Sequence, residues 1–128
     1  MSDRAPVMVL VTLQRHCAKL IRYGTDIALK QGSLLKVVHV TQNNEETNGD
    51  KVANADVLNY LYALANEAGA EMCMINADVA VTAMAEYAKE IGTKQIIMGD
   101  GKQAHGIAET LSSLLPGVAI GIIGEEVE

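Results

Sequence analysis

A repeated switch between continuous apolar runs and amphipathic stretches is the feature that most constrains how this chain folds. Five short runs are rich in Val, Ile, Leu and Met and show little polar alternation, which is typical of strands buried on both faces of a parallel sheet. Between them, apolar residues recur every three or four positions, as on one face of a helix. The sequence therefore predicts strands at residues 7–13, 34–41, 71–77, 95–99 and 118–123.

Four amphipathic stretches are expected to form the helices that connect these strands. Their apolar spacing places them at residues 15–31, 57–68, 78–91 and 107–114. Asp78 is the expected N-cap of the third helix, and residues 42–50 and 100–106 are expected to be loops. Strands that alternate with helices predict a three-layer α/β sandwich, in which a five-stranded parallel sheet carries helices on both faces. Ligands of such folds bind beyond the carboxyl ends of the strands, where the strand order reverses.

The length of 128 residues indicates a single domain that spans residues 1–128. A folded chain of this size buries about two-thirds of the surface that it exposes when unfolded. Trp and Phe are absent and Tyr occurs four times, so aliphatic side chains and Met must fill the core. The same shortage of aromatic side chains disfavours single-stranded nucleic acid as a ligand, because its bases stack on aromatic rings.

The charge and the cysteines exclude further classes of partner and site. A net charge of -6 argues against nucleic acid bound through the whole surface. No apolar run approaches the roughly 20 residues of a membrane span, and the first residues lack the organisation of a signal peptide. Cys17 and Cys73 fit neither a disulfide framework nor a zinc motif, and both stand in apolar surroundings. We therefore expect a cytoplasmic protein without a membrane segment.

Motifs of several enzymes and binding proteins with similar folds are missing from this sequence. A phosphate-accepting receiver domain needs acidic residues after the first strand, where Thr12, Leu13 and Gln14 stand instead. There is no G-x-x-x-x-G-K-[ST] phosphate loop, no G-x-G-x-x-G after the first strand and no nucleophile elbow. The histidines have no metal-ligand spacing. We therefore expect a binding or regulatory protein rather than an enzyme, with weak nucleotide hydrolysis left open.

Two histidines occupy informative positions. His39 stands inside the second predicted strand, where a hydrogen-bonded structural imidazole is a more common role than a ligand. His105 belongs to the predicted loop 100–106, where it either contacts a ligand or is an exposed, solvated side chain.

The segment with the clearest chemical rationale is residues 96–113, IIMGDGKQAHGIAETLSS. Glycines just past a strand let backbone N–H groups approach an anion, and the start of the next helix adds a partial positive charge. This pattern is compatible with phosphate binding. Glycine after a strand is also ordinary loop chemistry, so both interpretations stand at this point.

Several segments together resemble the universal stress protein domain, of the adenine-nucleotide α-hydrolase-like superfamily. They are VMVLVTL at residues 7–13, AKLIR at 18–22, VHV at 38–40, the helix at 78–90 and QIIMG at 95–99. The resemblance spans nearly the whole chain and is greatest to the stress-protein-like domains of bacterial potassium sensor kinases. It implies a parallel sheet in the order 3-2-1-4-5, a homodimer and, in some members, bound ATP.

The resemblance also implies which residues contact a nucleotide. The family motif after the fourth strand is similar to G-x-x-G-x9-G-[ST]; here one residue separates Gly99 from Gly101, and a Leu precedes Ser112. Carried over by position, Val40 offers its backbone to an adenine, the two glycines line the phosphates and Ser112 keeps a hydroxyl contact. The Asp that ATP-binding members carry after the first strand is missing, and Thr12 begins that stretch. The expected contact residues are therefore Thr12, Val40, Gly99, Gly101 and Ser112.

Two functions follow from these expectations. The first is a stress-response module that binds an adenine nucleotide, ATP or a related one, at the carboxyl edge of the sheet. The second is a dimerisation or protein-interaction domain without a ligand, because the glycine motif departs from the family pattern and an apolar last strand invites pairing. The expected homodimer forms through that strand, from Val118 to Ile123, and a signalling protein is a further expected partner.

Overall fold

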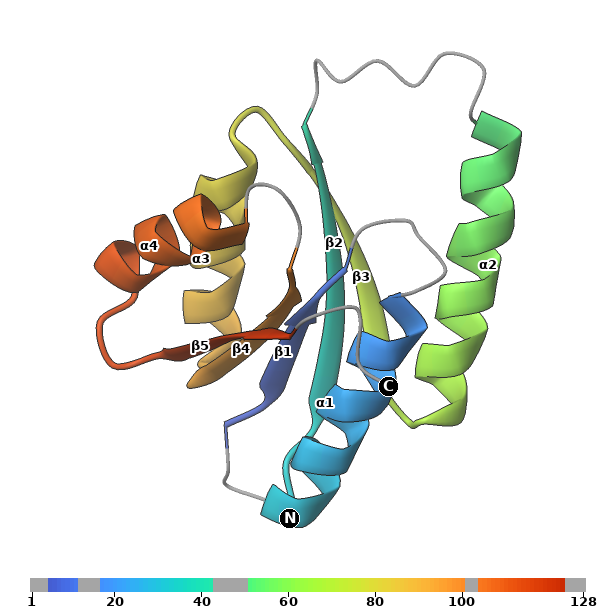
Figure 1. The fold of residues 1–128 in the computed structure, drawn as a ribbon, viewed down its shortest axis with the longest axis horizontal. Helices are drawn as coiled ribbons and strands as arrows, with labels where there is room; N and C mark the ends of the chain where they lie inside the picture. The colour runs from blue at the N-terminus through green and yellow to red at the C-terminus, as the bar shows by residue number, and fades with distance from the viewer. Residues whose placement is uncertain (1–4, 12–16, 43–50, 101–103, 124–128) are drawn as a thin grey trace.

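The computed structural model describes residues 5–11, 17–42, 51–100 and 104–123 (Figure 1). Their strands are β1 (Val7–Leu10), β2 (Leu35–Gln42), β3 (Glu71–Ala77), β4 (Gln95–Gly99) and β5 (Ala119–Ile123). The helices are α1 (Cys17–Gln31), α2 (Lys51–Glu67), α3 (Ala80–Ile91) and α4 (Ala104–Leu114). Across these ranges, no helix is both long and apolar enough to cross a membrane.

The strands form one parallel sheet with β1 at its centre. Neighbouring strands pair in the order β3-β2-β1-β4-β5, and every pair is parallel. Helices α1 and α2 cover one face of the sheet, and α3 and α4 cover the other (Figure 1). The predicted three-layer α/β sandwich and the strand order 3-2-1-4-5 are confirmed.

Two hydrophobic clusters, one on each face of the sheet, hold the layers together. Side chains of a strand alternate between its faces, so Val7 and Val9 of β1 pack in the α1/α2 cluster. Met8 and Leu10 pack in the α3/α4 cluster. A strand that is buried on both faces has no place for a polar side chain, which explains the continuous apolar runs of the sequence.

The strand boundaries follow the sequence closely. β3 and β4 coincide with the predicted strands, β2 is shifted by one residue at both ends, and β5 begins one residue later than predicted. Gln42, expected to open a loop, therefore ends β2. β1 ends at Leu10, earlier than predicted, and residues 12 and 13 of the predicted strand lie outside the described residues.

The helix starts differ more from the prediction. α2 begins at Lys51 and α4 at Ala104, both earlier than the apolar spacing indicated. His105 therefore lies in the first turn of α4 and not in a loop, because Gly106 has no positive φ and continues the helix. The prediction that Asp78 caps α3 was wrong. Val79 holds the N-cap position with an extended backbone (φ -124°, ψ 109°) and no side-chain cap hydrogen bond.

Candidate functional site

The topological switch point of the sheet lies between β1 and β4. The chain moves outward from β1 to β2 and β3 on one side, and then places β4 on the other side of β1. The register sets Leu10 of β1 opposite Val38 and Met98. Ligands of open α/β sheets bind at the carboxyl ends of the strands at such a point. β1 and β4 therefore lie side by side at the edge of the sheet where a ligand is expected from the sequence.

Val40 and Gly99 flank the carboxyl end of β1. In the described residues, the register of β1 against β2 runs as far as Leu10 and Val38, and Val40 pairs with Ile75 of β3. Gly99 is the last residue of β4. Because one strand lies between them, the two backbones are about 10 Å apart.

Gly99 also lies close to α1. A Cβ atom at this position would stand 3.3 Å from Cδ1 of Leu20, a tight contact that the end of the leucine side chain would have to relieve. A glycine at the end of β4 thus eases the approach of α1 to the sheet. Thr12 and Gly101, two other expected contact residues, lie outside the described residues.

The start of α4 stands close to Gly99 in the chain. Residues 100–103 connect β4 to α4, and Ala104 is buried in the α3/α4 cluster. The first amides of a helix have no acceptor within the helix, and the helix dipole adds partial positive charge there. Helix starts of this kind are common anion-binding sites in proteins.

Ser112 lies apart from these groups. It is the ninth residue of α4, so it stands about 12 Å along the helix axis from Ala104. Its exposed side chain lines a different hollow of about 450 Å³, between α4 and β5. The other residues lining that hollow are His105, Ala108, Glu109, Ser113 and Ile120. The structure thus brings Val40 and Gly99 to one edge and places Ser112 on the outer face of α4.

His39 makes the structural hydrogen bond that its strand position predicted. Its side chain is buried, and Nδ1 lies 3.0 Å from the carbonyl oxygen of Val11. Because a carbonyl only accepts, Nδ1 must carry the proton and donate it. The bond ties β2 to the end of β1, immediately before Val40. The sequence indicated the role of His39, but not that Val11 is its partner.

The residues of known chemical reactivity do not assemble a catalytic group in the described ranges. Cys17 is buried in the α1/α2 cluster, while Cys73 Sγ lies 3.0 Å from the Tyr87 hydroxyl. Burial, followed by the hydrogen bond with Cys73, raises the pKa of the Tyr87 hydroxyl above its ordinary value, so it stays protonated. No three His, Cys, Asp or Glu side chains of the described residues come together to hold a metal ion.

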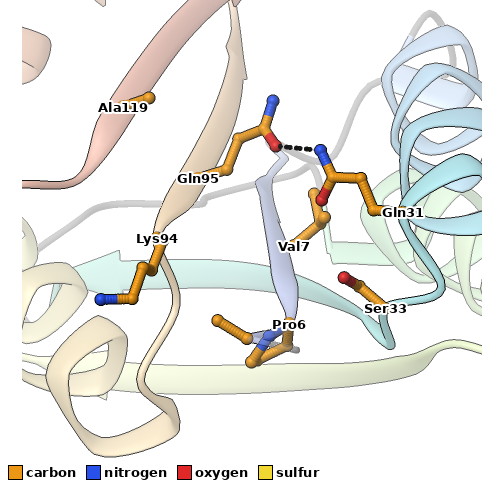
Figure 2. Close-up of a pocket in the computed structure, with 8 residues that line it drawn as sticks. Pro6, Val7, Gln31, Ser33, Lys94, Gln95 and Ala119 are labelled. Atoms are coloured by element: carbon orange, nitrogen blue, oxygen red, sulfur yellow. Dashed lines mark hydrogen bonds between the residues drawn. The ribbon is translucent and has the colours of Figure 1, made fainter. Parts of the chain in front are cut away.

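A second hollow lies at the opposite edge of the sheet, where β1, β4 and β5 begin (Figure 2). Its volume is about 480 Å³. Gln31, the last residue of α1, donates from Nε2 to Oε1 of Gln95 at 3.0 Å, and Lys94 points away from this amide pair (Figure 2). The C-terminus of a helix carries partial negative charge, which disfavours an anion beside Gln31.

No protein-family model and no curated protein matches this sequence, whereas solved structures do match the fold. A universal stress protein from Archaeoglobus fulgidus in complex with dAMP is 18% identical, over 95% of this chain and 99% of that chain, with a TM-score of 0.65. A universal stress protein in complex with cAMP is 14% identical, over 95% of this chain and 98% of that chain, also with a TM-score of 0.65.

The same arrangement of strands and helices also occurs inside a larger enzyme. A bacterial class III photolyase from Agrobacterium tumefaciens matches 97% of this chain with a TM-score of 0.71 at 17% identity, but only 26% of the photolyase is covered. Identities this low establish a common fold and not a common function. Because the two universal stress proteins match over nearly their whole length, the chain has the universal stress protein fold.

Proposed function

We propose that this chain is a universal-stress-protein-like module that binds an adenine nucleotide at the carboxyl edge of its sheet. The observation that carries the proposal is the geometry of the switch point. Val40 of β2 and Gly99, the last residue of β4, stand on either side of β1 at the carboxyl edge of the sheet. The solved universal stress proteins that hold dAMP and cAMP support an adenine nucleotide as the ligand class.

Each residue has a specific part in this proposal. The backbone of Val40 hydrogen-bonds the edge of the adenine, which carries both a donor and an acceptor. Gly99 and the first amides of α4 donate to a phosphate. Thr12 and Gly101 stay predicted contact residues of this proposal, and both lie outside the described residues. We infer a binding and regulatory role rather than catalysis, because these contacts include no nucleophile and no general base.

Saturable thermal stabilisation by AMP is the expected result. A ligand that binds only the folded chain adds about 2.7 kcal/mol at a hundredfold excess over its Kd, which raises the Tm by several degrees. Differential scanning fluorimetry across an AMP titration measures this. GMP is the matched control and should stabilise less, since its base presents a different edge to the Val40 backbone. A Tm that stays flat at millimolar AMP contradicts nucleotide binding.

We also propose that the chain forms a homodimer through its last strand, as the resemblance implies. β5 is an edge strand whose Ile120 and Ile122 pack towards α3 and α4, while its outer backbone groups have no strand partner in the described chain. Such an edge favours pairing with a second chain. A signalling protein, of the kind represented by bacterial potassium sensor kinases, is the further partner that the resemblance suggests.

Gly121→Lys is expected to convert that dimer to a monomer. A Cβ atom at Gly121 meets no atom within 4 Å, so the isolated chain accommodates the new side chain, whereas a charge on an edge strand opposes pairing. Light scattering should show the mass fall from twice 13.6 kDa to 13.6 kDa. Gly106→Lys, at an equally open position on α4, is the control that should stay dimeric. A native chain that is monomeric at every concentration contradicts the proposal.

A further inference from the structure

We propose that the hollow where β1, β4 and β5 begin is a second binding site, which takes a small zwitterion of the class of free aliphatic amino acids. The hollow lies at the opposite edge of the sheet from the proposed nucleotide site, so its ligand is independent of that function. Its volume of about 480 Å³ falls within the range of roughly 300–1,000 Å³ that is usual for small-molecule sites. Every residue that lines it belongs to the described chain.

The hollow exists because α1 packs on β1 and β4 and leaves the start of β5 uncovered. The register places Val7, Gln95 and Ala119 side by side on three neighbouring strands. The side chain of Gln31, at the end of α1, reaches as far as Gln95, and Ala119 on the next strand is exposed. Pro6, Val7 and Ala119 give the hollow an apolar surface that suits an aliphatic side chain.

Backbone amides that line the hollow are already hydrogen-bonded. Val7 donates to the carbonyl oxygen of Leu34, and Ala119 donates to that of Lys94, both at 2.9 Å. A backbone group that is paired within the fold has little to offer a ligand. The charge and the hydrogen-bonding groups that a ligand meets therefore come from side chains and from the end of α1.

One wall of the hollow offers hydrogen-bond acceptors. The Gln31 amide donates from Nε2 to Gln95, which leaves its Oε1 as an acceptor. Figure 2 shows this oxygen on the side of Val7 and Ser33, and the Ser33 hydroxyl lines the same wall. The last carbonyl groups of α1 add partial negative charge. This wall therefore favours an ammonium group, which is positively charged and donates up to three hydrogen bonds.

Lys94 supplies the opposite charge at the other wall. Its exposed side chain comes from the residue before β4 and lies across the hollow from Gln31 and Ser33 (Figure 2). Within the part of the chain that the structure describes, its ammonium forms no ion pair. A carboxylate on the ligand gives Lys94 a partner, whereas a simple cation is repelled by Lys94 and a simple anion by the end of α1. A ligand that carries both charges satisfies both walls.

Isothermal titration calorimetry at neutral pH with L-leucine, isoamylamine and isocaproate tests the proposal. The three compounds share one branched aliphatic group, but the amine lacks the carboxylate and isocaproate lacks the ammonium. L-leucine is expected to bind about tenfold more tightly than either, because only L-leucine makes a charged hydrogen bond at each wall. If either single-charge compound binds as tightly as L-leucine, or if L-leucine does not bind at millimolar concentration, the proposal is overturned.

Lys94→Gln tests whether the ligand occupies this hollow. The variant should bind L-leucine about tenfold more weakly, but isoamylamine no more weakly than the native chain does, because the amine has no carboxylate contact to lose. Lys30→Gln removes an exposed lysine that does not line the hollow, so this matched control should keep the native affinities. In NMR spectra, L-leucine should shift the side-chain amide signals of Gln31 and Gln95. Unchanged affinity in Lys94→Gln, or shifts confined to other residues, contradicts the assignment.

Discussion

Replacing Leu111 with Ala is expected to lower the free energy of unfolding by about 2–5 kcal/mol. Leu111 is completely buried and belongs to the cluster that joins α4 to Ile96 and Met98 of β4. Removing its side chain loses both the apolar transfer free energy and the contacts around the cavity that remains. Urea denaturation followed by circular dichroism measures the loss as a lower midpoint with an unchanged slope.

Leu114→Ala is the control for this prediction. Leu114 lies in the same helix, three residues further along, but 41% of its surface is exposed. Its truncation should cost less than about 1 kcal/mol, since little apolar surface returns to water. Equal losses in the two variants would contradict the orientation of α4, and with it the position of Ser112 on the outer face.

The strands could be predicted from the sequence because burial on both faces leaves a strong pattern. QIIMG, with its three buried central residues, matches β4 to the residue. EMCMINA also matches β3 to the residue, although β3 is an edge strand whose side chains are half-buried or exposed. Polar side chains are uncommon in a strand that is buried on both faces, so the first polar or glycine residues mark its ends. Helix starts are harder to predict: the apolar spacing that marks this helix in the sequence begins at Val57, six residues after α2 starts at Lys51.

The candidate site was predictable only in part, for a related reason. Gly99 ends a predicted strand and Val40 is the last residue but one of another, so the topology alone brings them to one edge. Ser112 lies inside the predicted helix 107–114 as well as inside α4. Because α4 starts at Ala104 rather than at Ile107, the serine is the ninth residue of the helix rather than the sixth, which moves it further from the helix start. The partner of His39 was likewise not predictable, because it required the register of β1 against β2.

Gly24→Val is expected to destabilise the fold by about 3 kcal/mol, at the upper end of the usual cost of overpacking. Gly24 lies in the buried face of α1, where even a Cβ atom would stand 2.5 Å from Cγ2 of Val9 and 3.1 Å from Cδ1 of Leu35. Val9 is fully buried in the central strand and has a stiff, branched side chain, so it cannot move aside. The helix must therefore shift away from the sheet.

Two further variants distinguish this clash from a general effect of valine in a helix. A Cβ atom at position 106 of α4 meets no atom within 4 Å. The free energy of unfolding of the Gly106→Val variant should therefore differ from that of the native chain by less than about 0.5 kcal/mol. Val9→Ala removes the methyl group that the new side chain would strike. The double variant, Val9→Ala with Gly24→Val, should therefore cost less than the sum of the two single changes in urea denaturation. Strictly additive losses would contradict the direct packing of α1 on β1 at Gly24, and hence the layer that brings Leu20 against Gly99 at the candidate site.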